Sequence, residues 1–191
     1  MDLPKRKPNR LRGYDYDRPG AYFITFCTQN RRCVLSRIVG GGAHDAPRVE
    51  LTELGKIVDK YIRSGNRMEH ISVDKYVIMP NHVHILLSVT GTDCERAPNG
   101  TSRAPCGTSR APCGTSRAPC GTSRAPSPTN QLVPRFVSTL KRFCHAEMGQ
   151  KLFQRSFHDH VIRNEADYRE IWQYIDGNPG KWEEDKFYIV M

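Results

Sequence analysis

A tandem heptapeptide in the middle of the chain constrains how the rest can fold. The unit Gly-Thr-Ser-Arg-Ala-Pro-Cys occurs three times from Gly100 to Cys120, and a fourth copy, from Gly121 to Ser127, ends in serine. A seven-residue period is typical of coiled coils, but each unit contains a glycine and a proline and has no apolar pair to form a seam. We therefore expect a disordered insertion at about 91–128, because these residues bury too little apolar surface to offset their chain entropy.

The sequence outside the insertion is long enough for one domain but short for two. The whole chain has 191 residues, of which 38% are apolar and 26% are charged, as is ordinary for a globular protein. No apolar run approaches the roughly 20 residues of a membrane-spanning helix. The basic start of the chain has no apolar stretch of the kind found in signal peptides. We expect a single cytoplasmic domain over residues 1–191, interrupted by the insertion, with no membrane partner.

The net charge of the chain indicates a polyanionic partner. The formal charge is +9, and it remains +5 when the four arginines of the repeat are left out, which favours nucleic acid as the ligand. The cysteines indicate neither a disulfide framework nor a zinc knuckle. Several of them belong to the repeat, and Cys27, Cys33 and Cys144 have no CxxC spacing.

Runs of β-branched and aromatic residues alternate along the chain with helical patterns. Strands are predicted at 21–28, near 33–35, at 73–79 and at 82–89, with a short extended segment at 153–163. The spacing of apolar residues and the capping residues predict helices at about 52–64, 132–148 and 164–177. This alternation favours an α/β or α+β architecture in which helices pack against one sheet.

The motif His82-Val83-His84 lies on a predicted strand. Residues two apart on a strand point to the same face, so both imidazoles project together while Val83 packs behind them. Two imidazole nitrogens on a rigid strand make half of a divalent-metal site. The alternative is a pair of histidines on a solvated sheet face, because short motifs often occur without a function.

The last predicted helix carries a tyrosine that its core does not need. Its buried stripe follows helical spacing and consists of Tyr168, Ile171, Trp172 and Ile175. Tyr174 and Asn178 lie one turn apart at an edge of this stripe, so a phenol and an amide oxygen are neighbours. The alternative is an ordinary boundary tyrosine beside an asparagine that ends the helix.

Four parts of the chain outside the insertion match one known family in order. They are Gly13–Tyr16 with Gly20–Thr25, Tyr76–His84, Phe153–Asn164, and Tyr174-Ile175 followed by Asn178-Pro179. In these segments the chain resembles the REP-associated tyrosine transposases, within the larger superfamily of single-tyrosine, His-hydrophobic-His transposases. The segments span nearly everything outside the insertion, and the insertion removes no motif residue.

The resemblance implies a fold and a set of site residues. The fold would be α+β, a ferredoxin-like antiparallel sheet with helices packed on one face, the histidines on a central strand and the tyrosine on a late helix. His82 and His84 would be metal ligands, Asn178 the third ligand, and Tyr174 the nucleophile. The ion would be Mg²⁺ or Mn²⁺, and the substrate would be single-stranded or hairpin DNA.

The resemblance also implies a metal-dependent nickase and strand transferase. Tyrosine has a pKa near 10 and is a poor nucleophile unless its phenol is deprotonated or polarised as it attacks. A cation on the scissile phosphate would stabilise the charge that develops in the transition state. Attack by Tyr174 would give a 5′-phosphotyrosine intermediate and a free 3′-hydroxyl. The alternatives are a relative that binds hairpin DNA or RNA without cutting it, and a metal-dependent hydrolase that uses water.

Basic residues outside the insertion are candidate contacts for DNA phosphates, with a solvated surface charge as the alternative for each. The candidates are Arg10, Arg12, Lys141, Arg142, Arg155 and Arg163. Asp159 and His160 are interpreted as a structural or DNA-positioning pair. The sequence leaves open whether Tyr174 serves the histidines of its own chain or those of a partner, so a monomer and a homodimer both fit.

Overall fold

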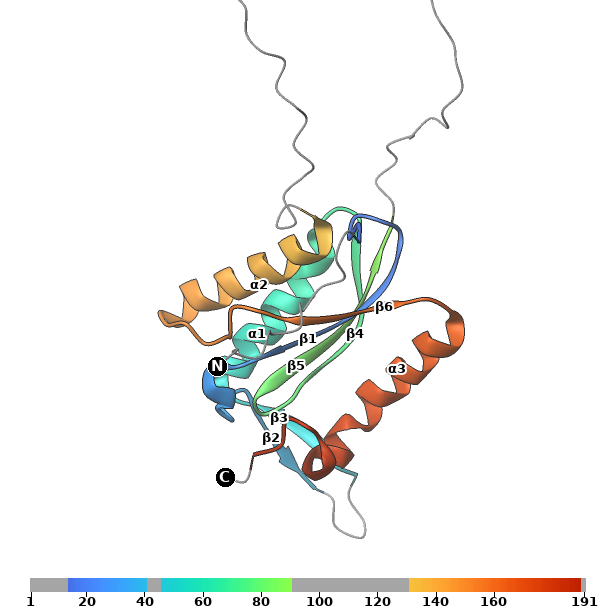
Figure 1. Ribbon diagram of the computed structural model, residues 1–191. Helices are drawn as coiled ribbons and strands as arrows, with labels where there is room; N and C mark the ends of the chain where they lie inside the picture. Colours follow the sequence, from blue (N-terminus) through green and yellow to red (C-terminus); the bar gives the residue numbers. More distant parts are fainter. Residues whose placement is uncertain (1–13, 41–45, 91–130, 190–191) are drawn as a thin grey trace, which may run out of the picture.

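A four-stranded antiparallel sheet with helices on both faces organises the described residues (Figure 1). The computed structural model describes residues 14–40, 46–90 and 131–189; the insertion expected at 91–128 lies outside them, as do Arg10 and Arg12. The sheet strands are β1 (Gly20–Cys27), β4 (Ile71–Ile78), β5 (His82–Val89) and β6 (His158–Ile162). Their order in the sheet is β4-β5-β1-β6, and each neighbouring pair is antiparallel.

Two helices join these strands in the β-α-β-β-α-β order of a ferredoxin-like fold. Helix α1 (Glu53–Ser64) lies between β1 and β4, and α2 (Leu132–Met148) lies between β5 and β6. A separate hairpin of β2 (Ser36–Val39) and β3 (Arg48–Leu51) precedes α1. After β6 the chain forms α3 (Glu165–Gly177) and the 3-10 segment η3 (Asn178–Glu184). The expected α+β fold with an antiparallel, ferredoxin-like sheet is confirmed.

The two faces of the sheet are covered by different helices. Val83, Ile85 and Leu87 of β5 belong to the main core, which they share with α1 and α2. Leu86 points the other way and packs against Ile171 and Ile175 of α3. Helices α1 and α2 therefore cover one face, as expected, whereas α3 lies against the opposite face (Figure 1). The sequence did not predict this second layer, because an amphipathic pattern shows that a helix is buried but not which face it covers.

Local signals explain where the helices begin and end. Thr52 accepts a hydrogen bond from the Gly55 amide and caps α1, as predicted. Asn164 does the same for α3 through the Asp167 amide. The prediction of a stop at Gly177-Asn178-Pro179 holds for α3, but η3 continues from there, because proline is tolerated in the first turn of a helix. The β2–β3 hairpin was not predicted, and the short strand expected at 33–35 begins instead at Ser36.

The packing of α1 against the segment before β2 requires a residue without a side chain at position 55, which is Gly55. A Cβ at this position would collide with the carbonyl oxygen of Leu35. Gly55→Ala should lower the free energy of unfolding by about 1–3 kcal/mol, the usual effect of overpacking, although alanine itself favours a helix. Gly177→Ala is the control, because an added Cβ there meets nothing within 4 Å. Urea unfolding compares the two, and equal stability of both variants would contradict the packing argument.

Candidate functional site

His82 and His84 come from the central strand β5 and lie buried on the face that α3 covers. Their exposed fractions are 0% and 1%, and their Nε2 atoms are 3.0 Å apart. Val83, between them, belongs to the core on the opposite face. The alternation along the strand therefore brings the two imidazoles together, as the sequence predicted. They do not lie on a solvated face.

Hydrogen bonds to the two Nδ1 atoms orient the imidazole rings. His82 Nδ1 lies 2.8 Å from Asn81 Oδ1. Because the Asn81 amide nitrogen donates to the Phe187 carbonyl, its oxygen is the acceptor and His82 Nδ1 is the donor. His84 Nδ1 lies 2.7 Å from Thr25 Oγ1. Because His82 Nδ1 carries the proton, the Nε2 of His82 is unprotonated and acts as an acceptor. A partner on the outer nitrogen is the usual support of a metal-binding histidine.

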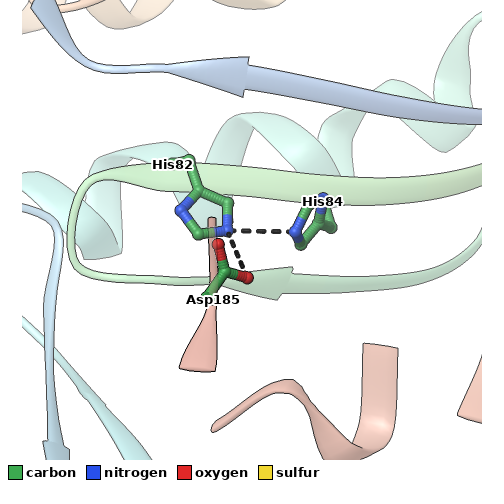
Figure 2. Close-up of side chains that lie close together, drawn as sticks. All are labelled: His82, His84 and Asp185. Atoms are coloured by element: carbon green, nitrogen blue, oxygen red, sulfur yellow. Dashed lines mark hydrogen bonds and ion pairs between the residues drawn. The ribbon is translucent and has the colours of Figure 1, made fainter. Parts of the chain in front are cut away.

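The C-terminal segment brings oxygen ligands to the histidine pair. Asp185 Oδ2 lies 4.0 Å from His82 Nε2, and His82, His84 and Asp185 each offer one ligand atom within 4.8 Å of the others (Figure 2). Asn178, the predicted third ligand, is 3% exposed and donates from Nδ2 to Asp185 Oδ2 at 3.3 Å. The arrangement thus contains a carboxylate that the sequence analysis did not single out.

Asn178 Oδ1 provides the test of whether a cation fits these residues. This oxygen is buried and has no hydrogen-bond partner among the described residues. Leaving a buried polar atom unpaired costs about 1–3 kcal/mol, and a nearby cation would remove that cost. Imidazole nitrogens with carboxylate and amide oxygens form a donor set suited to a divalent metal ion. The residues present therefore fit a metal site.

The position of Asp185 depends on the fold of the residues after η3. The Phe187 amide donates to Asp185 Oδ1 at 2.6 Å, and the Asn81 side chain holds the Phe187 carbonyl. These contacts turn the carboxylate towards the histidines. In the sequence, Asp185 ends an acidic run with Glu183 and Glu184, and no spacing relates this run to His82 or His84. Only the tertiary contacts show that Asp185 lies near the two histidines.

Tyr174 of α3 lies beside the histidines of its own chain. Its hydroxyl is 3.4 Å from His84 Nε2 and 3.4 Å from Asp185 Oδ2. The residue is 41% exposed, so it lies beside the histidine pair and is also open to solvent. Burial, with the nearby Asp185 carboxylate, raises the pKa of Tyr174 to about 12. The phenol is therefore protonated at neutral pH in the metal-free protein.

A cleft of about 800 Å³ opens beside this cluster, between the C-terminal segment, α3 and strands β1 and β6. His84, Tyr174, Asn178 and Asp185 line it. Its volume is within the range of pockets that bind small ligands. The tyrosine and three of the four candidate ligands therefore face one cleft.

Among the predicted DNA contacts, Lys141 has a structural role. Lys141 is buried, and its Nζ donates to the carbonyl oxygens of Gln154 and Ser156, each at 2.9 Å. Arg142 lies over the Phe143 ring. Arg155 and Arg163 are exposed. These three arginines therefore lie at the surface, whereas the lysine is buried.

The Asp159–His160 pair is held by separate contacts. Asp159 accepts a hydrogen bond from the Tyr16 hydroxyl, and His160 Nε2 lies 3.0 Å from an Asp167 oxygen. Both contacts connect β6 to other elements, in line with the structural interpretation of this pair.

Comparisons with known proteins agree with the fold described above. No family model matches the chain. An uncharacterised protein of Haemophilus influenzae (strain Rd) is 28% identical over 188 residues, which cover 96% of this chain and 93% of that protein. A solved structure of a REP-associated tyrosine transposase bound to a REP hairpin has a TM-score of 0.51 and 19% identity, and the match covers 95% of this chain and 74% of that one. A candidate transposase of Deinococcus radiodurans has a TM-score of 0.39 at 19% identity over 88% of this chain and 95% of that one.

In the part of the chain that the structure describes, no helix has the length and apolar character needed to cross a membrane.

The buried histidines predict a pH dependence of stability in the metal-free protein. Burial lowers the pKa of His82 to about 4 and that of His84 well below its ordinary value. Between pH 6.5 and 4 the unfolded chain binds protons that the folded chain does not. The free energy of unfolding is thus at its full value above pH 6.5 and falls as the pH decreases towards 4, by on the order of 3 kcal/mol for His82.

Urea unfolding in a chelator, at a series of pH values, measures this dependence. His82→Gln should flatten the curve between pH 6.5 and 4, because one of the two groups no longer titrates. The same slope in the wild-type protein and in His82→Gln would contradict the assignment.

Proposed function

We propose that the chain is a transposase, a metal-dependent DNA nickase and strand transferase that acts on single-stranded or hairpin DNA through Tyr174. The observation that carries this proposal is the 3.4 Å separation of the Tyr174 hydroxyl from His84 Nε2, in a His-hydrophobic-His motif on a ferredoxin-like sheet. The similar fold of a REP-associated tyrosine transposase that was solved with a REP hairpin supports DNA as the substrate. The net charge of +9 agrees with a polyanionic partner.

His82, His84, Asn178 and Asp185 would hold a divalent cation, Mg²⁺ or Mn²⁺. When bound, the cation would stabilise the negative charge that develops on the scissile phosphate. The unpaired Asn178 Oδ1 supports its predicted role as a ligand, and Asp185 is added to the predicted set because of its distance from His82. Asn81 and Thr25 would position the two imidazoles through their Nδ1 atoms.

Tyr174 would supply the attacking oxygen, and Asp185 would receive its proton. The Tyr174 hydroxyl already donates a hydrogen bond to Asp185 Oδ2, which suits a general base. Attack forms a bond between the phenol oxygen and the 5′-phosphate and breaks the bond between phosphorus and the 3′-oxygen, which takes a proton from water. Attack of a 3′-hydroxyl on the phosphotyrosine reverses these steps, so strands are joined without ATP.

The position of Tyr174 beside the histidines of its own chain supports a monomer that uses its own tyrosine. We also propose that residues 1–191 form one cytoplasmic domain. Tyr174 and both histidines belong to the same chain. The connection that contains the heptapeptide repeat begins after Val89, at the opposite end of β5 from His82. A strand of this length spans roughly 23 Å at about 3.3 Å per residue. The insertion therefore departs from the sheet far from the candidate ligands.

A hairpin oligonucleotide with a single-stranded tail tests the nucleophile. With Mg²⁺ or Mn²⁺, the protein should form a covalent adduct that retains a label at the 3′ end of the DNA and releases the fragment labelled at the 5′ end. Tyr174→Phe keeps the ring but has no hydroxyl, so the adduct should disappear on a denaturing gel. Cleavage without adduct that persists in Tyr174→Phe would instead indicate hydrolysis by water, and hairpin binding without cleavage would indicate a non-catalytic relative.

Single substitutions test the metal ligands. His84→Ala and Asp185→Asn should each weaken Mn²⁺ binding, measured by calorimetry, at least about tenfold, and should slow adduct formation by a larger factor. His70→Asn is a matched control, because His70 lies outside the cleft and has a positive φ that asparagine tolerates. Unchanged Mn²⁺ affinity in His84→Ala would contradict the proposed site.

A further inference from the structure

A second pocket lies beyond the end of β1, outside the cleft that contains Tyr174. Its volume is about 540 Å³, and it lies between the turn after β1, the C-terminal half of α2 and the segment that precedes β6. Polar and basic side chains that line it include Gln29, Asn30, Lys141, His145, Lys151 and Arg155. We refer to it as the basic pocket.

The basic pocket is cationic, whereas the Tyr174 cleft contains many carboxylates. No aspartate or glutamate is among the described residues that line the basic pocket. The cleft is lined by two lysines, Lys181 and Lys186, but by five carboxylates, those of Asp159, Asp167, Glu170, Glu184 and Asp185. Lys151 and Arg155 are exposed, and within the described ranges no carboxylate forms an ion pair with either. A polyanion is therefore attracted to the basic pocket more strongly than to a metal-free cleft.

The turn at one side of the basic pocket, η1 (Gln29–Arg31), has an unusual backbone. Asn30 and Arg31 have φ values of 56° and 53°, a region that asparagine tolerates but that costs other residues about 1–2 kcal/mol. Such a conformation persists where the surroundings fix it, and it is frequent at functional sites. Here the Gln29 amide donates to the Leu152 carbonyl at 2.7 Å, and the Thr28 hydroxyl donates to the Arg32 carbonyl at 2.8 Å. The turn therefore presents exposed amide and guanidinium groups from a fixed backbone.

Lys141 fixes the opposite side of the basic pocket. Its ammonium group holds the carbonyls of Gln154 and Ser156. The backbone amide of Gln154 in turn donates to the Cys27 carbonyl at 3.0 Å, and its side-chain Nε2 donates to the Thr28 carbonyl at 3.1 Å. The segment that carries Lys151 and Arg155 is thus tied to the end of β1, and these cations need little reordering to meet a ligand.

The turn also connects the basic pocket to the histidine site. The Thr28 amide donates to the Asn81 carbonyl at 2.8 Å, and the Asn81 side chain orients His82. On the same side, the guanidinium of Arg31 lies 5.4 Å from the centre of the Phe187 ring, which is 4.6 Å from that of His82. The turn therefore lies between the basic pocket and the histidine site and contacts both.

We propose that the basic pocket binds the base-paired part of a DNA hairpin, so that the unpaired strand runs past Arg31 into the Tyr174 cleft. Lys151 and Arg155 contact backbone phosphates, and the amides of Gln29 and Asn30 reach base edges. This inference rests on the proposed function for its ligand. Two surfaces then have different roles. The basic pocket supplies affinity for the duplex, and the carboxylate-rich cleft admits the strand to be cut.

Fluorescence anisotropy with a labelled hairpin DNA tests this division. All proteins carry Tyr174→Phe and are measured in a chelator, so that neither cleavage nor metal binding contributes. Lys151→Ala with Arg155→Ala should weaken hairpin binding about tenfold and reduce the slope of log K against log salt by about 2, because two phosphates are no longer neutralised by the protein. The control, Lys56→Ala with Arg67→Ala, removes two exposed cations on the side of α1 and should change the affinity less than about twofold.

Three results would overturn the inference. They are a wild-type protein with no affinity for the hairpin, equal losses in the two double variants, and an equal loss for the single-stranded tail alone. The outcome is separable from that of the adduct assay. A protein that binds the hairpin through Lys151 and Arg155 but forms no adduct would retain this inference and lose the proposed chemistry. Adduct formation by the wild-type protein, together with unchanged hairpin binding in the Lys151/Arg155 variant, would support the proposed chemistry and contradict this inference.

Discussion

The burial of two neighbouring imidazoles on the central strand is the constraint on which the arrangement of the second layer depends. His82 and His84 lose the solvation of four ring nitrogens, and burying an unpaired polar atom is unfavourable. Asn81 and Thr25 satisfy the Nδ1 atoms. The Nε2 atoms face each other and the Asp185 carboxylate. Helix α3 and the C-terminal segment complete an environment that is polar at its centre and apolar around it.

The sequence predicted those parts of the site that depend on the periodicity of one element. Alternation along a strand places His82 beside His84, and helical spacing places Tyr174 beside Asn178. The parts that depend on contacts between elements were not predictable in this way. Asp185 reaches the histidines through contacts of Phe187 and Asn81, and the burial of Lys141 follows from how the 153–157 segment crosses α2. Neither fact leaves a pattern in the nearby sequence.

Charge is distributed unevenly between the two depressions of the surface, and this has a consequence for the order of binding. Carboxylates outnumber lysines in the lining of the cleft beside Tyr174, which disfavours phosphates there until a cation offsets the excess negative charge. The basic pocket has no such barrier. Under the proposed function, a hairpin can associate before a cation does, whereas entry of the strand into the cleft depends on the cation. Affinity and cleavage are then controlled by different residues.

The two faces of the sheet divide folding from chemistry. The main core lies between the sheet and helices α1 and α2, while the tyrosine, the histidines and the carboxylate lie on the other side. Loss of a site residue would leave that core untouched. Under the proposed function, a chain that lost its activity through such a change would still bind the same DNA. It would then compete with active chains for their substrate.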